Sequence, residues 1–131
     1  MASELRVNTL KDAAGSNEVA MTYVANGSAK AWVHFTSVTT TTAQDSLNIS
    51  SLTDTDTGDT TVNISNAFSN DDYACVMFTN ADSGTGAGAF NNNYTGGLFS
   101  RTTSSIDHTA HNGTNPTDSA LNDIVFHGDL A

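Results

Sequence analysis

The chain has 131 residues, only four Lys and Arg against fourteen Asp and Glu, and a formal net charge of −10. Nucleic-acid binding is therefore close to excluded, because phosphate neutralisation needs a basic surface, and an anionic membrane is an equally poor partner. Hydrophobic residues make up 37% and charged residues 14%, so hydroxyl and amide side chains dominate, and these suit strands and turns. A small domain this poor in apolar residues is expected to bury surface against identical copies.

Residues 1–17 are expected to form an arm that is separate from the rest of the chain. A weak apolar pattern is interrupted by the Gly and Asn of "DAAGSN" (12–17). An arm with so few apolar groups becomes ordered only by pairing with other chains. We therefore expect four residues to serve attachment or trimerisation: Leu5, Arg6, Val7 and Leu10.

The segment "MTYVANGSAKAWVHF" (21–35) is predicted to form a β-hairpin. Two β-rich runs, 21–24 and 31–35, flank Asn26-Gly27. This dipeptide favours a type I′ turn, in which both central residues need positive φ. We expect Trp32 to belong to the core or to a subunit contact.

The middle of the chain predicts strands joined by turns, with a Thr-rich linking or edge strand over 36–46. In "DTDTGD" (54–59) the Asp side chains cap backbone amides and Gly58 supplies positive φ. The run "YACVMF" (73–78) is apolar on both faces, which is typical of a central strand. Cys75, the single cysteine, is expected to be a buried small apolar residue.

Residues 80–119 are dense in Gly, Asn, Ser and Thr and are expected to form a loop-rich distal region. Short strands are predicted there around "GAF", "GGLFSRTT" and "SSID". The final strand, 124–127, is expected to pair inside a sheet, which favours a sandwich. The predicted fold is all-β: an antiparallel, jelly-roll-like β-sandwich head over residues 18–131.

Two polar clusters contain residue types that bind metal ions, and no cofactor is expected. "DTDTGD" lacks the third ligand and the terminal Glu of an EF-hand. In "DHTAH" (107–111), His108 and His111 could hold a metal, above all around a threefold axis; the alternative is a solvated loop. No Gly-x-Ser-x-Gly elbow and no phosphate-binding glycine spacing occurs, so nothing in the sequence supports an enzyme.

The segment "AFNNNYTGGLF" (89–99) has the composition of a recognition loop, with aromatic rings for stacking and amides for hydroxyl contacts. A surface glycan or an outer-membrane protein would be a natural target. The alternative is that the aromatic residues anchor loop strands in the core. The candidate contact residues are Asn92, Asn93, Tyr94 and Phe99.

The runs "NGSAKAWVHF", "DSLNISSLTDTDTGDTTVNISNAFSNDDYACVMF" and "IVFHGDLA" resemble a module of bacteriophage tail-fibre and other virion appendage proteins. The opening "SELRVNTLKDAAG" is similar to the starts of fibre proteins of phages that infect marine bacteria. Thr60 and Ser69 stand where the module usually has Tyr and Pro.

This resemblance implies a homotrimeric virion protein, made in the host cytoplasm, whose amino end binds other virion proteins and whose distal loops face the host. A capsid-decorating or cement protein is the alternative interpretation. A polysaccharide depolymerase fragment ranks last. No amino-terminal apolar run is present, so neither a signal peptide nor membrane insertion is expected.

Overall fold

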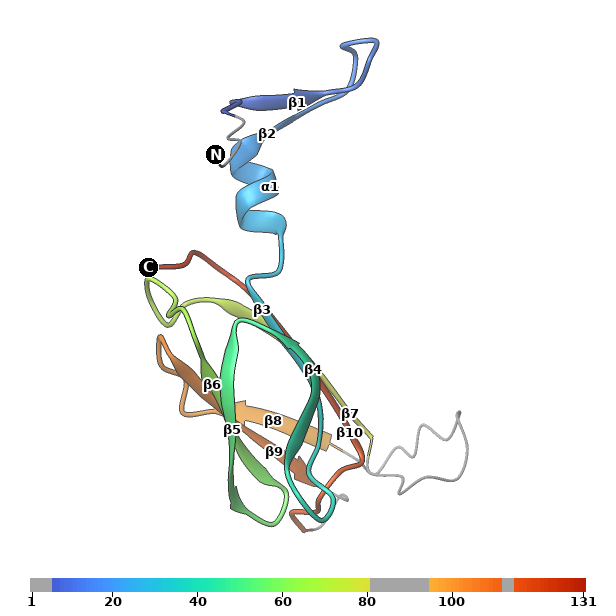
Figure 1. Ribbon diagram of the computed structural model, residues 1–131, viewed down its shortest axis with the longest axis vertical. Helices are drawn as coiled ribbons and strands as arrows, with labels where there is room; N and C mark the ends of the chain where they lie inside the picture. The colour runs from blue at the N-terminus through green and yellow to red at the C-terminus, as the bar shows by residue number, and fades with distance from the viewer. Residues whose placement is uncertain (1–5, 81–94, 112–114) are drawn as a thin grey trace, which may run out of the picture.

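The computed structural model describes residues 6–80, 95–111 and 115–131 (Figure 1). Within these ranges the protein is all-β with antiparallel sheets, as the sequence predicted, and has one short helix. The elements in chain order are β1 Thr9–Lys11, β2 Glu18–Ala20, α1 Met21–Gly27, β3 Ala31–Thr36, β4 Thr42–Leu47, β5 Ile49–Asp56, β6 Asp59–Ile64, β7 Ala74–Asn80, β8 Thr95–Phe99, β9 Ser105–His111 and β10 Leu121–His127.

Eight of these strands form two four-stranded sheets. Sheet I has the order β4-β3-β10-β7 and sheet II the order β5-β6-β9-β8. The chain passes from sheet I to sheet II at Asn48, which has a positive φ of 58° and exchanges hydrogen bonds with Asn66. The head formed by both sheets lies below the β1-β2 hairpin and α1, which extend away from it in Figure 1.

The two sheets share one hydrophobic core. Because successive side chains of a strand point to opposite faces, β3, β6, β9 and β10 alternate between buried and partly exposed positions. The buried apolar cluster contains Ala31, Val33, Phe35, Val62, Ile64, Phe68, Tyr73, Ile106, Ile124 and Phe126. Trp32 is on the opposite face of β3 and is partly exposed, so the expectation that it belongs to the core is wrong.

The predicted hairpin at Asn26-Gly27 is also wrong. Residues 21–27 form α1, and β3 pairs instead with β4 and β10. Both edges of β3 are therefore occupied by strands from elsewhere in the chain. With no free edge on β3 to pair with, the residues before it adopt a helix that has no side-chain N-cap and no buried residue.

Two predicted strands occur where the sequence indicated them. β4 is an edge strand with every residue exposed, as the Thr-rich run predicted. β10 is paired on both sides, with β3 and β7, as predicted for the last apolar strand.

β7 corrects the prediction of a central strand, because it is the edge of sheet I. Its inward side chains, Cys75 and Met77, are partly buried against the core. Its outward Val76 is 68% exposed. Both faces of β7 are apolar, but only the inward face packs against the core, and the outward face is exposed to solvent.

Part of the loop-rich region is regular structure. The predicted short strands around "GGLFSRTT" and "SSID" coincide with β8 and β9, which pair with each other. The one predicted around "GAF" lies outside the described residues.

The β5-β6 turn contains a glycine that no other residue can replace without strain. Gly58 has a φ of +78°, and a Cβ there would lie 2.5 Å from the Thr117 backbone nitrogen and 2.7 Å from the Ala110 carbonyl oxygen. The Asp56 carboxylate accepts a hydrogen bond from the Thr57 amide, and the Asp118 carboxylate accepts one from the Gly58 amide. The predicted roles are thus confirmed for Gly58 and for Asp56, whereas Asp59 Oδ1 is buried with no hydrogen-bond partner and the second carboxylate comes from Asp118, outside the turn.

Gly58→Ala should lower the free energy of unfolding by at least about 2 kcal/mol, because it combines a disfavoured φ with overlap against backbone atoms. Urea unfolding measures the effect. Gly27→Ala is the matched control, since nothing lies within 4 Å of a Cβ at that position. Equal unfolding midpoints for the two variants would contradict this account of the turn.

Candidate functional site

The outer face of sheet I, the face directed away from the core, carries a continuous row of apolar side chains. Trp32 pairs with Leu47 on one side and with Val125 on the other, and Val125 pairs with Val76. Directly opposite residues of neighbouring strands have Cβ atoms about 5 Å apart. These four residues, here called the apolar row, therefore cross the whole sheet from the β4 edge to the β7 edge.

The apolar row is open to solvent at both ends. Leu47 is 48% and Val76 68% exposed, whereas Trp32 and Val125 on the central strands are partly exposed. A contiguous exposed apolar surface of this kind is typical of an interaction site.

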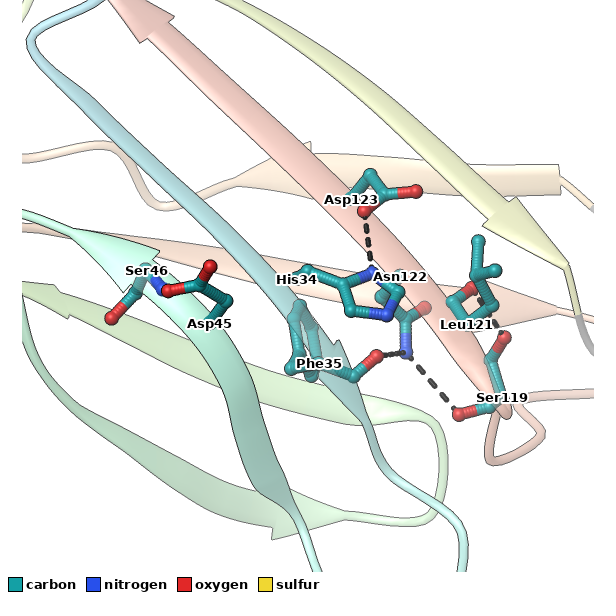
Figure 2. A network of polar contacts seen from close by, with 8 residues as sticks. All are labelled: His34, Phe35, Asp45, Ser46, Ser119, Leu121, Asn122 and Asp123. Carbon is teal, nitrogen blue, oxygen red and sulfur yellow. Dashed lines mark hydrogen bonds and ion pairs between the residues drawn. The ribbon is translucent and has the colours of Figure 1, made fainter.

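The next row of the same face carries ionisable side chains on β4, β3 and β10 and the exposed Phe78 on β7. His34 pairs with Asp45 on β4 and with Asp123 on β10, and its Nδ1 lies 2.7 Å from Asp123 Oδ1 (Figure 2). Both side chains of this contact are partly exposed, so an ion pair formed with protonated His34 contributes at most about 1 kcal/mol. The His34 ring is thus directed toward Asp123, whereas Asp45 Oδ1 accepts a hydrogen bond from the Ser46 amide.

The outer face of sheet II has a different chemistry. Thr61 Oγ1 donates to Asp107 Oδ1 at 2.6 Å, and the Asn63 amide group donates to the Ser51 and Thr53 hydroxyls at 3.1 Å. These polar groups satisfy one another and suit contact with water. The asymmetry between the sheets therefore marks the outer face of sheet I as the candidate apolar contact surface of the head and gives sheet II a polar surface.

The arm carries a second set of exposed apolar side chains. Val7 is 38%, Leu10 42%, Val19 38% and Tyr23 75% exposed. Lys11 and Glu18 form an exposed ion pair across the β1-β2 hairpin, and α1 has no buried residue. Isolated two-stranded hairpins and short helices are marginal in water, so these elements need a further surface to cover them.

The four residues predicted for attachment have separate outcomes. Leu5 lies outside the described residues, and the predicted boundary after residue 17 falls between β1 and β2. Arg6 and Val7 are exposed just before β1, and Leu10 is exposed within it. Sequence reasoning missed Val19 and Tyr23, because the predicted arm ended at residue 17 and Tyr23 was assigned to the hairpin of the head.

Of the predicted receptor contacts, Asn92, Asn93 and Tyr94 lie outside the described residues. Phe99 ends β8, pairs with Asp107 of β9 and is 45% exposed. Its neighbour Leu98 packs against the core instead. Because side chains alternate along β8, Leu98 anchors the strand in the core and Phe99 lies on the surface.

His108 and His111 cannot share a metal ion, because β9 directs them to opposite faces. His108 is 1% exposed, so the alternative of a solvated loop is wrong as well. Among the residues that the structure describes, no group of three or more His, Cys, Asp or Glu side chains could hold a metal ion.

His108 belongs to a polar layer of the interior. Its Nε2 shares a hydrogen bond of 3.0 Å with Thr79 Oγ1 of sheet I, and its ring meets Phe35 edge-on with centroids 5.4 Å apart. Its Nδ1 and the Thr60 hydroxyl, directly across the strand pair, have no protein partner. Burial lowers the pKa of His108 from 6.5 to about 4, although Asp59 acts in the opposite direction.

In residues 6–80, 95–111 and 115–131, no helix has the length and apolar character needed to cross a membrane. Comparison of the chain with protein families, curated proteins and solved structures finds no match. The arguments on function therefore depend on the surfaces described above.

The stability of the head should fall as the pH drops from 6.5 to 4. Between these values the unfolded chain binds a proton at His108 that the folded chain does not, which costs up to about 3 kcal/mol at pH 4. Above pH 6.5 this contribution is constant, because the histidine is neutral in both states. Urea unfolding at fixed protein concentration measures the slope.

His108→Gln should remove this part of the slope, whereas His111→Gln, on the outer face of β9, should retain it. An unchanged pH dependence in His108→Gln would show that the buried histidine does not titrate as described.

Proposed function

We propose that the protein is a non-enzymatic structural component of a bacteriophage particle, a homotrimeric tail fibre or related appendage that contacts the host surface. It is made in the host cytoplasm and incorporated into the virion. The observation that carries the proposal is the arm. Its hairpin and helix extend from the head with exposed apolar side chains and no core of their own.

An attachment role explains why the chain retains the β1-β2 hairpin and α1, whose stability in isolation is marginal. Val7, Leu10, Val19 and Tyr23 acquire a buried environment when the arm docks on virion proteins or on the arms of other copies. The free energy gained is of the order of 1.5–3 kcal/mol for each large apolar side chain that becomes fully buried. The arm then orders during incorporation rather than before it.

The head fits the same role. We propose that sheets I and II form a jelly-roll-like β-sandwich, and the shared core between them supports this arrangement. The outer face of sheet II and the β8 edge present hydroxyl groups together with the exposed ring of Phe99. Aromatic and hydroxyl groups of this kind suit contact with a surface glycan or an outer-membrane protein, and three weak sites on one trimer gain avidity.

A capsid-cementing protein would use the same arm and head, with the arm bound to neighbouring shell subunits. Imaging of purified particles by electron microscopy, with an antibody against the head, distinguishes the two roles. Label at the tail supports the appendage, and label distributed over the shell supports the cement protein. Particles without the protein would contradict both.

Leu10→Asp combined with Tyr23→Asp should reduce the number of copies per particle at least about tenfold, because charges replace the side chains that the arm buries on attachment. Ala13→Asp, in the exposed turn of the same arm, is the matched control and should incorporate normally. Quantitative immunoblotting of purified particles measures the ratio. Normal incorporation of the double variant would refute attachment through the arm.

A further inference from the structure

We infer that the outer face of sheet I is the surface through which copies of this chain meet, with the copies parallel and their β3 and β10 strands facing a common axis. The inference rests on the proposed function, to which it adds a specific interface. Its first basis is the apolar row. Leu47, Trp32, Val125 and Val76 span the sheet from edge to edge, whereas sheet II directs hydroxyls, amides and carboxylates outward, with the ring of Phe99 at its β8 edge.

A ring of parallel copies closes the apolar row on itself. When the copies are related by rotation about an axis parallel to the strands, equivalent residues of all copies lie at the same height along that axis. The β7 edge of one copy then lies beside the β4 edge of the next, so that Val76 approaches the neighbouring copy's Leu47. Both exposed ends of the row are covered by this contact, and so are the two sheet edges, which would otherwise be open to unwanted pairing.

The neighbouring row, which contains His34 and Asp123, is complementary in the same arrangement. Because β3 and β10 are adjacent at the centre of sheet I, His34 and Asp123 alternate around the axis. Each His34 then lies between Asp123 of its own copy and Asp123 of the neighbouring copy. In this arrangement a protonated His34 faces the neighbouring copy's Asp123 as well as its own, whereas Asp45 stays on the β4 edge.

The arm explains why the copies run in parallel. It leaves the head where β3 begins, and it extends beyond that end (Figure 1). Parallel copies bring their arms together at one end, where Leu10, Val19 and Tyr23 can cover one another. Antiparallel copies would send the arms in opposite directions and leave these side chains exposed.

Cysteine cross-linking tests the interface directly. In the full chain, Leu47→Cys and Val76→Cys are combined with Cys75→Ala, and the protein is oxidised under mild conditions. The two new thiols cannot join within one chain, since three strand spacings of about 4.8 Å separate them and a disulfide needs Cα atoms within about 7 Å. Both positions are exposed, so the variant should retain its fold, which circular dichroism checks.

We expect most of the protein to migrate in non-reducing gels as a covalent trimer of three 13.6 kDa chains. The yield of this trimer should not fall when the protein is diluted before oxidation. Each single cysteine variant in the Cys75→Ala background should remain uncross-linked, because residue 47 meets residue 76 and not itself. Thr53→Cys combined with Phe99→Cys controls for random collision and should give no covalent trimer, because these exposed positions lie on the β5 and β8 edges of sheet II, three strand spacings apart.

A chain that is oligomeric by sedimentation but is not cross-linked by the sheet I pair would overturn the inference. It would leave the proposed function intact, because attachment through the arm is tested separately on particles. Cross-linking of the sheet II pair at equal yield would overturn it too. A chain that remains monomeric at the concentration of the experiment would overturn both this interface and the homotrimer of the proposed function.

Discussion

The alternation of side chains along β3, β10, β6 and β9 is the constraint on which the rest of the structure depends. Each of these strands directs one set of residues into the single shared core, so the composition of the other set decides what each sheet can contact. On sheet II the outward set is polar and satisfies itself, as Thr61 and Asp107 do. On sheet I it includes Trp32 and Val125, which connects the folding of the head to the proposed assembly of the chain.

Elements governed by local chemistry could be predicted from the sequence. The β5-β6 turn followed from the glycine at position 58, whose positive φ leaves little choice of residue. β10 followed from an apolar run at the end of the chain, and the exposed β4 from a Thr-rich segment with little to bury. The all-β class followed from the shortage of charged residues and the abundance of hydroxyl and amide side chains.

Features that depend on distant strands were not predictable. The hairpin signal at Asn26-Gly27 failed because β4 and β10 occupy both edges of β3. His108 looked like part of a polar loop, yet it enters the core from β9, which pairs with the remote strand β6 as well as with its neighbour β8. The apolar row was missed for the same reason, since its four members come from four strands and only their pairing reveals it.

Sedimentation equilibrium of the full chain over a range of micromolar concentrations is the most direct measurement of whether apolar surface is shared between identical copies. The account predicts a species of three times 13.6 kDa whose thermal midpoint rises with protein concentration, because assembly stabilises the folded state by mass action. A fully folded species of 13.6 kDa, with a midpoint that does not change on dilution, would contradict it.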